Sequence, residues 1–220
     1  MHRIAPRTAV VGSAFLASAA LTVAVLPFSA TATGDGAGHG HGGTHTHGEL
    51  NSLNNSGAVG KAHAVVKGRK VHVKVAARGL APNLPHAQHI HYGQQARNEC
   101  PTAGKDDANG DFRLETGEGV PAYGPIAISL TKKGDTSPAS GLAVDRFPTA
   151  PKGHVHYKRT VSTSKEVSKA IRRGEGVVVI HGVDYNGNGT YDFTSAGKSD
   201  LDPSLPSEAT DPAVCGVLHR

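Results

Sequence analysis

The chain has 220 residues, among them 28 glycines, 13 prolines, two cysteines and no tryptophan, and only 5% are aromatic. This composition suits a single domain with a small core rather than several large ones. The formal net charge of +5 is weak evidence for a nucleic-acid partner, because most basic residues between 67 and 78 occupy the polar positions of an alternating strand pair. The sequence has no nucleic-acid signature, phosphate loop or nucleophile motif.

Residues 1–32 have the pattern of a secretory signal peptide. Arg3 and Arg7 precede an apolar run over 10–28, and small residues at 30–32 provide a cleavage site. An uncleaved anchor is the alternative, since about 20 apolar residues can span a bilayer, but alanine, serine and glycine dilute the run. We therefore expect a secreted, extracellular or cell-surface-associated protein with no stable membrane anchor after cleavage. Its charge then falls from +5 to +3, because both arginines leave.

Residues 33–56 predict a disordered leader rich in histidine and glycine, because the stretch 33–48 has almost nothing to bury. Imidazoles on a flexible backbone can gather copper or zinc ions at neutral pH. The leader's four candidate ligands are His39, His41, His45 and His47. The alternative is a soluble leader that binds metals only because histidines do so.

Residues 57–220 predict one β domain. Val71, Val73 and Val75 alternate with polar residues, which is the period of a half-buried strand. The stretch 58–66 is similar, and Lys67-Gly68-Arg69 predicts a hairpin turn between the two. Further strands are predicted at 86–92, 125–131, 154–161, 176–181 and 214–218.

One short helix is predicted after residue 162. Thr163 and Glu166 form a capping-box pattern, Val167, Ala170 and Ile171 share a face, and Gly174 ends the helix. Many short strands, turns rich in glycine and proline, long loops and a single helix indicate an all-β, antiparallel sandwich or barrel.

Cys100 and Cys215 are the two cysteines. In an oxidising compartment the default expectation is that they form one disulfide.

Residues 86–92 carry the first candidate site, with the pattern HxxHxH over His86, His89 and His91. His89 and His91 project from the same face of a strand, so both imidazoles can reach one ion. Imidazole suits copper and zinc. A pair of surface histidines is the alternative for an isolated HxH.

The motif is not isolated. Gly79-Leu80, the HxxHxH strand, Cys100, the strand 177–181 and the closing Cys215-Gly216-Val217-Leu218 together resemble the Cu,Zn superoxide dismutase family. The resemblance implies a superoxide dismutase-like Greek-key fold and a Cys100–Cys215 disulfide. It also implies that His89, His91 and His181 are copper ligands and that His86 buttresses the site.

The middle of the chain departs from that family. Residues 93–152 contain no histidine, although the family's bridging and zinc-binding histidines belong there, and Pro212 stands where the family has an arginine that attracts superoxide. A zinc site is therefore not expected, and efficient dismutase activity is not expected either. The segment Gly124-Pro125-Ile126 to Leu130, after His89-Ile90-His91, is instead similar to the CHRD (chordin-type) domain, which implies a related sandwich.

Two further histidines, His154 and His156, form another HxH pair on a predicted strand and are alternative ligands if they face His89 and His91. A surface pair is the other interpretation.

A second candidate site is a calcium loop beginning at Asp184. Its oxygen side chains at loop positions 1, 3, 5 and 9 are Asp184, Asn186, Asn188 and Asp192, with glycine at position 6. Position 12 is Ser195 rather than glutamate, and a plain asparagine–glycine turn is the alternative. A similar pattern from Asp107 to Glu118 has Phe112 at position 6, and there we favour a solvated loop.

The sequence therefore predicts a secreted, metal-binding β protein of superoxide dismutase-like or CHRD type without efficient dismutase activity, with copper and calcium as candidate ions. A copper-only superoxide dismutase that lacks the zinc site is one alternative. The other is a structural or cell-surface interaction module whose histidines are incidental. The sequence names no protein partner.

Overall fold

The computed structural model describes residues 42–220, and these form one curled antiparallel sheet. The predicted signal peptide, His39 and His41 lie outside the described residues. The strands are β1 (Thr44–Ser52), β2 (Val59–Lys67), β3 (Lys70–Arg78), β4 (Gln88–His91), β5 (Ile126–Ser129), β6 (Val155–Ser162), β7 (Gly176–His181) and β8 (Pro212–Leu218).

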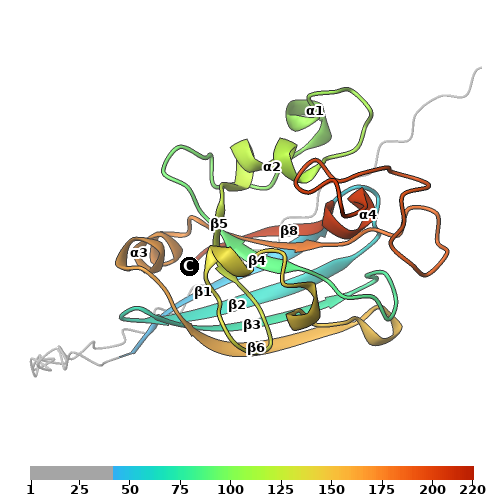
Figure 1. Cartoon of the computed structure of the whole chain (residues 1–220). Helices are drawn as coiled ribbons and strands as arrows, with labels where there is room; N and C mark the ends of the chain where they lie inside the picture. The colour runs from blue at the N-terminus through green and yellow to red at the C-terminus, as the bar shows by residue number, and fades with distance from the viewer. Residues whose placement is uncertain (1–41) are drawn as a thin grey trace, which may run out of the picture. The chain divides into compact units, whose positions relative to one another are not determined.

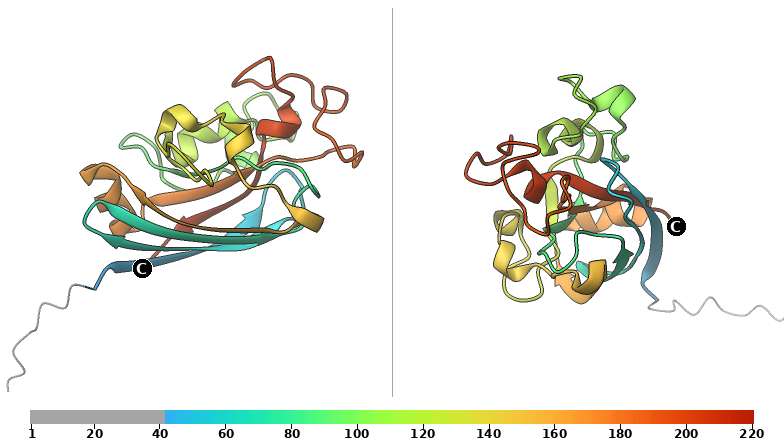
Figure 2. Two further views of the ribbon diagram at one scale, coloured as in Figure 1. Left: turned by 60° about the horizontal axis from the view of Figure 1, so that its bottom comes forward. Right: turned by 90° about the vertical axis from the view of Figure 1, so that its right-hand side faces the viewer.

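The strand order is β5-β4-β7-β8-β1-β2-β3-β6, and every neighbouring pair is antiparallel. We call β4, β5, β7 and β8 the upper half-sheet, and β1, β2, β3 and β6 the lower half-sheet. The chain crosses between the halves after β3, β5 and β6, which is Greek-key connectivity. The sheet curls so that the halves face each other as a half-barrel (Figures 1 and 2). The predicted all-β, antiparallel class is confirmed.

The main core lies between the two half-sheets. From β3 below, Val71 and Val73 point inward and are fully buried, as the period of two predicted. From above, Ile90, Val178 and Ile180 join the same cluster. The predicted hairpin is also confirmed: β2 and β3 pair along their full length, and Gly68 in the turn has φ +60°.

Strand β1 corrects the predicted leader. Residues 44–52 form a strand that pairs with β2 on one side and β8 on the other, so the prediction of disorder is wrong for these residues. Thr46 and Leu50 point into the core. Gly48 and Gly216 allow β1 and β8 to approach closely, because a Cβ on either would overlap a backbone carbonyl of the other strand. The composition of residues 44–52 does not indicate a strand, because the strand is stabilised by its pairing with β2 and β8 rather than by local preference.

The helices within residues 42–220 are short. They are α1 (Ala103–Asp106), α2 (Thr116–Tyr123), α3 (Lys165–Arg173) and α4 (Ser207–Thr210), with single 3₁₀ turns η1 (Pro138–Ser140), η2 (Val144–Arg146) and η3 (Pro151–Gly153).

Helix α3 is the predicted helix, with one correction. Its N-cap is Ser164 rather than Thr163, because the Ser164 hydroxyl accepts the Val167 amide at 3.0 Å. Ala170 and Ile171 are buried. Gly174 ends the helix with φ +90°, as predicted.

Helix α2 was not predicted, because Gly117, Gly119 and Pro121 are poor helix formers. A capping box between Glu115 and Glu118 begins it. Together with the segments around η1, η2 and α4, α2 covers the outer face of the upper half-sheet (Figures 1 and 2). Strand β7 is therefore buried on both faces, with Val178 and Ile180 in the main core.

Candidate metal centre

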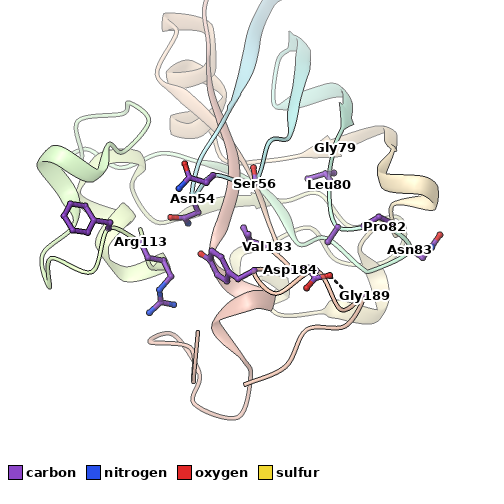
Figure 3. Close-up of a pocket in the computed structure, with 16 residues that line it drawn as sticks. Asn54, Ser56, Gly79, Leu80, Pro82, Asn83, Arg113, Val183, Asp184 and Gly189 are labelled. Carbon is purple, nitrogen blue, oxygen red and sulfur yellow. Dashed lines mark hydrogen bonds between the residues drawn. The ribbon is translucent and has the colours of Figure 1, made fainter. Parts of the chain in front are cut away.

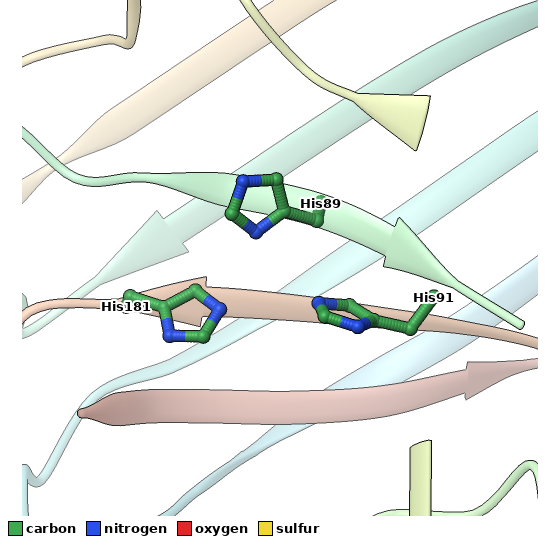
Figure 4. Close-up of side chains that lie close together, drawn as sticks. All are labelled: His89, His91 and His181. Carbon is green, nitrogen blue, oxygen red and sulfur yellow. The ribbon is translucent and has the colours of Figure 1, made fainter. Parts of the chain in front are cut away.

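Three histidines lie together on the outer face of the upper half-sheet. His89 and His91 occupy alternate positions of β4 and point the same way, and His181 ends β7, the strand next to β4. The ring centroid of His89 is 5.5 Å from that of His91 and 5.2 Å from that of His181 (Figure 4). All three side chains are buried.

Each ring donates one hydrogen bond to a backbone carbonyl oxygen of the covering segments. The pairs are His89 Nε2 with Gly141 O at 3.1 Å, His91 Nδ1 with Gly124 O at 2.8 Å, and His181 Nδ1 with Thr210 O at 2.5 Å. Because a carbonyl oxygen only accepts, each bonded nitrogen carries the hydrogen, and the opposite nitrogen of a neutral ring has a free lone pair.

The three lone pairs converge. His89 Nδ1, His91 Nε2 and His181 Nε2 are buried and have no hydrogen-bond partner. The three residues can each offer one ligand atom within 4.8 Å of the others. Buried polar atoms without a partner are costly, and a metal ion between the rings would satisfy all three. Metal-ligating histidines characteristically donate their other ring N–H to a carbonyl or carboxylate, so the residues present fit a metal ion.

The rings are held neutral by their surroundings. Burial, and then the proximity of His181, lowers the pKa of His91 to about 3. Burial lowers the pKa of His181 to about 4. Burial, followed by the neighbouring His181 and His91, lowers the pKa of His89 well below its usual value. At neutral pH the cluster therefore presents three unprotonated nitrogen donors.

No fourth histidine, cysteine, aspartate or glutamate of residues 42–220 joins the cluster. The nearest aromatic ring is Tyr123, 4.4 Å from His91 between centroids, but its hydroxyl donates to the Thr116 carbonyl oxygen. Three imidazoles with an open fourth position are a donor set for copper or zinc, and not for calcium, which takes oxygen ligands.

A cavity of about 310 Å³ lies over the three rings. Its walls come from the segments that accept the histidine hydrogen bonds, and they are mostly aliphatic: Val120 from α2, Leu142 from the turn after η1, and Leu201 and Leu205 before α4. Lysine, arginine, aspartate and glutamate are absent from the residues that line it. Any metal on the three rings would therefore face an apolar chamber.

His86 supports the centre from behind. Its ring nitrogens Nδ1 and Nε2 lie 2.8 and 3.0 Å from the carbonyl oxygens of His181 and Ala81, and its side chain is fully buried. The hydroxyl of Tyr191 is 3.3 Å from His86 Nδ1. His86 thus fixes the backbone of a candidate ligand and does not join the cluster.

His154 and His156 do not join the centre, which corrects their interpretation as alternative ligands. His156 lies on β6 opposite Ala76 of β3, in the lower half-sheet, and both histidines are exposed. Strand alternation places their neighbours Val155 and Tyr157 in the core and turns the histidines outward.

The histidines of the predicted leader also differ from expectation where they are described. His45 and His47 are exposed on β1 and not on a flexible segment. His45 Nδ1 lies 3.3 Å from His63 Nε2 on β2. His45 and His63 thus form a pair on the surface of the sheet, and neither His45 nor His47 belongs to a flexible tail that collects metal ions.

The predicted disulfide between Cys100 and Cys215 is confirmed. Cys215 lies on β8 and packs with Val177, Val179 and Tyr123 in a second buried cluster, on the same face of the sheet as the three histidines. The bond thereby ties the segment that leads to α2, which provides Gly124, to the sheet beneath it.

The loop of the predicted calcium site follows β7 directly. Asp184 accepts the amides of Asn188 at 3.2 Å and Gly189 at 2.8 Å, beside an open hollow that Arg113 also lines (Figure 3). Asp192 accepts the side-chain amide of Asn188 at 2.6 Å. The predicted ligands at positions 1, 5 and 9 therefore lie close together in one tight loop.

Glu208 is a residue that sequence reasoning missed. It is fully buried on α4 and accepts the amides of Tyr185 at 3.0 Å and Asp192 at 2.8 Å, as well as the hydroxyl of Ser195. It shapes the loop from behind. No local signal marks it, because it lies 16 residues beyond Asp192.

No helix of residues 42–220 is long and apolar enough to cross a membrane. No known family model matches the chain, and none of the curated proteins matches it.

Proposed function

We propose that this protein is exported and binds one copper ion through His89, His91 and His181, as a superoxide dismutase-like or CHRD-type domain. The observation that carries the proposal is the convergence of three buried lone pairs with no hydrogen-bond partner. Each ring is fixed by a carbonyl hydrogen bond, so the site is preorganised for a metal ion rather than assembled around it.

Copper is favoured over other ions by the donor set. Three neutral imidazoles suit copper and zinc, and copper(II) binds nitrogen sites more tightly than zinc along the Irving–Williams series. Bound copper would supply an open coordination position and two accessible oxidation states. The resemblance of the HxxHxH strand and of the strand ending at His181 to the superoxide dismutase pattern supports the same ion.

Export is supported by two independent features. The first 32 residues predict a signal peptide, and Cys100 and Cys215 form a disulfide. Structural disulfides persist chiefly in oxidising compartments outside the cytoplasm.

The test is copper binding by the full chain in which His39 and His41 are replaced by glutamine, so that these tail histidines do not contribute. One equivalent of copper(II) should bind, with nitrogen hyperfine structure in its electron paramagnetic resonance spectrum. Substituting His89, His91 or His181 by alanine should weaken binding strongly. The matched control is the exposed pair His154→Ala and His156→Ala, which should bind as the parent does.

If the triple substitution of the three buried histidines binds copper as tightly as the parent, the proposal is wrong. Tighter retention of zinc than of copper at equal exposure would assign the site to zinc instead. A protein that retains no metal at all would favour the structural-module alternative.

The copper-only dismutase remains the second candidate, because the centre has three histidines and an open side. Two features speak against an efficient enzyme. The cavity lining offers no lysine or arginine to draw in an anion, and electrostatic steering can change on-rates by 10–10³. Ile126 also lines the cavity, where the resemblance to the superoxide dismutase family would place its bridging imidazole. Stopped-flow decay of superoxide should be little faster than with copper on a peptide of the histidine-rich tail, and a near-diffusion-limited rate would make this second candidate correct.

We also propose a calcium ion in the loop from Asp184 to Asp192. Asp184 accepts the backbone amides of Asn188 and Gly189, and the side chain of Asn188 donates to Asp192, so the residues of positions 1, 5 and 9 already lie close together. Position 12 is Ser195, whose hydroxyl bonds to Glu208. The loop itself therefore supplies no bidentate carboxylate, and modest affinity for calcium is expected.

A further inference from the structure

We propose that the chamber over the three histidines is a binding site for a small, neutral, largely apolar molecule that carries one lone-pair donor. This rests on the proposed metal centre and extends it, because the donor atom of the ligand would take the open coordination position. A substituted imidazole, pyridine or thioether has the required chemistry.

The first argument is the shape and chemistry of the chamber. Its volume of about 310 Å³ is at the lower end of the range of small-molecule sites. The lining contains no lysine, arginine, aspartate or glutamate. A charged ligand would lose its hydration there without gaining a partner.

The second argument is the distribution of exposed apolar side chains. In residues 42–220 six large hydrophobic residues are exposed, and four of them line this one chamber. The four are Val120, Leu142, Val144 and Leu201, and they are 38–50% exposed. Scattered single apolar residues need no explanation, but a cluster at one cavity marks a binding site.

The third argument is the placement of polar atoms. Of the buried side-chain atoms without a hydrogen-bond partner in the described part of the chain, the only ones that belong to the chamber lining are the histidine nitrogens. The hydroxyl of Thr116 is already bonded to the Thr210 carbonyl oxygen, and that of Tyr191 is next to His86. A ligand would therefore be recognised through its one donor atom, which binds the metal at the floor of the chamber, and through apolar contacts everywhere else.

The experiment compares imidazole with 4-phenylimidazole as probes of the copper(II)-loaded full chain, by calorimetry and by the ligand-field absorption band. The two probes share a donor nitrogen and differ by a phenyl ring. Burial of that ring should make 4-phenylimidazole bind about 10–100-fold more tightly than imidazole.

Two variants locate the effect. Leu142→Ser combined with Leu201→Ser should abolish most of the phenyl advantage while copper retention and imidazole affinity stay unchanged, since neither leucine contributes a ligand atom. Phe193→Ser is the matched control, because Phe193 is 48% exposed but does not line the chamber. It should leave the advantage intact.

Copper stoichiometry and the melting temperature are measured for every variant before the probes are added, so the two proposals fail separately. Absence of copper binding overturns the metal centre and, with it, this inference. Copper binding with equal affinity for both probes overturns this inference alone and makes the chamber a passage for small ligands. A dimer in sedimentation that dissociates in the double variant also overturns it, because the apolar rim would then belong to a second copy of the chain.

Discussion

Mild acid is expected to destabilise the metal-free protein, because three histidines can take up protons only when it unfolds. In the folded state the pKa of His91 is about 3 and that of His181 about 4, and that of His89 is also well below the ordinary value. In the unfolded chain all three return to about 6.5. The contribution of these three histidines to the free energy of unfolding is therefore complete well above pH 6.5 and is lost progressively as the pH falls through and below that value.

The slope follows from the difference in bound protons. Each histidine contributes about 1.4 kcal/mol per pH unit once its unfolded form is protonated, so three contribute about 4 kcal/mol. Asp211 opposes them: burial raises its pKa to about 7 although Arg113 and Tyr185 hold it down. As the pH falls below 7 this carboxyl takes up a proton in the folded state while it stays charged in the unfolded chain, and it offsets up to one histidine. For these four groups the expectation is a loss of up to about 2.7 kcal/mol per pH unit between pH 6 and 5, against a typical total of 5–15 kcal/mol. His86, whose pKa is also lowered by burial, adds to the loss.

The assay is urea unfolding of chelator-treated protein at half-unit steps from pH 7 to 5, above the range in which ordinary carboxyl groups titrate. His91→Gln should reduce the slope by about 1.4 kcal/mol per pH unit. The exposed pair His154→Gln and His156→Gln is the control and should leave the slope unchanged. A free energy of unfolding that is constant or rises from pH 6.5 to 5 would refute the reasoning.

Four further predictions concern the fold and the loop. Cys100→Ser with Cys215→Ser should lower the free energy of unfolding by about 4.8 kcal/mol, the chain-entropy value for a sequence separation of 115 residues, and an unchanged urea midpoint would contradict this. Gly216→Ala should destabilise by at least about 1–3 kcal/mol, because its Cβ overlaps the Glu49 carbonyl oxygen of β1; an unaltered melting temperature would show that β1 can move away. Removal of residues 1–48 should lower the melting temperature far more than removal of residues 1–41, because only the former cuts into β1, and equal melting would assign β1 no role in stability. Calcium at 100 times its dissociation constant should raise the free energy of unfolding by about 2.7 kcal/mol, and Asp184→Asn should remove this effect. A chelator-treated sample that melts at the same temperature with and without millimolar calcium would exclude the site.

Much of the sheet could be predicted because its signals are local. The alternation of Val71, Val73 and Val75 defines β3 and its inward face. The spacing of His89 and His91 places both on one side of β4. These features depend only on the period of a strand, which the sequence carries directly.

The segments that cover the histidines could not be predicted, because they hold the rings through backbone groups rather than through side chains. The carbonyl oxygens of Gly124, Gly141 and Thr210 set the orientation of all three rings. A carbonyl oxygen has no residue-type signature, so no motif marks those positions. For a similar reason β1 was missed: Gly48 in that strand is a weak strand former that stays in place because β8 approaches it closely.

The covered position of the three histidines has a kinetic consequence. The groups that fix the rings come from around residues 124, 141 and 210, so the centre is complete only after these distant segments have closed over the sheet. Metal uptake should therefore follow folding, and metal release should be limited by the rate at which a covering segment opens. Because the Cys100–Cys215 bond anchors the segment that carries α2, reduction of that bond should speed metal exchange well before the fold itself is lost.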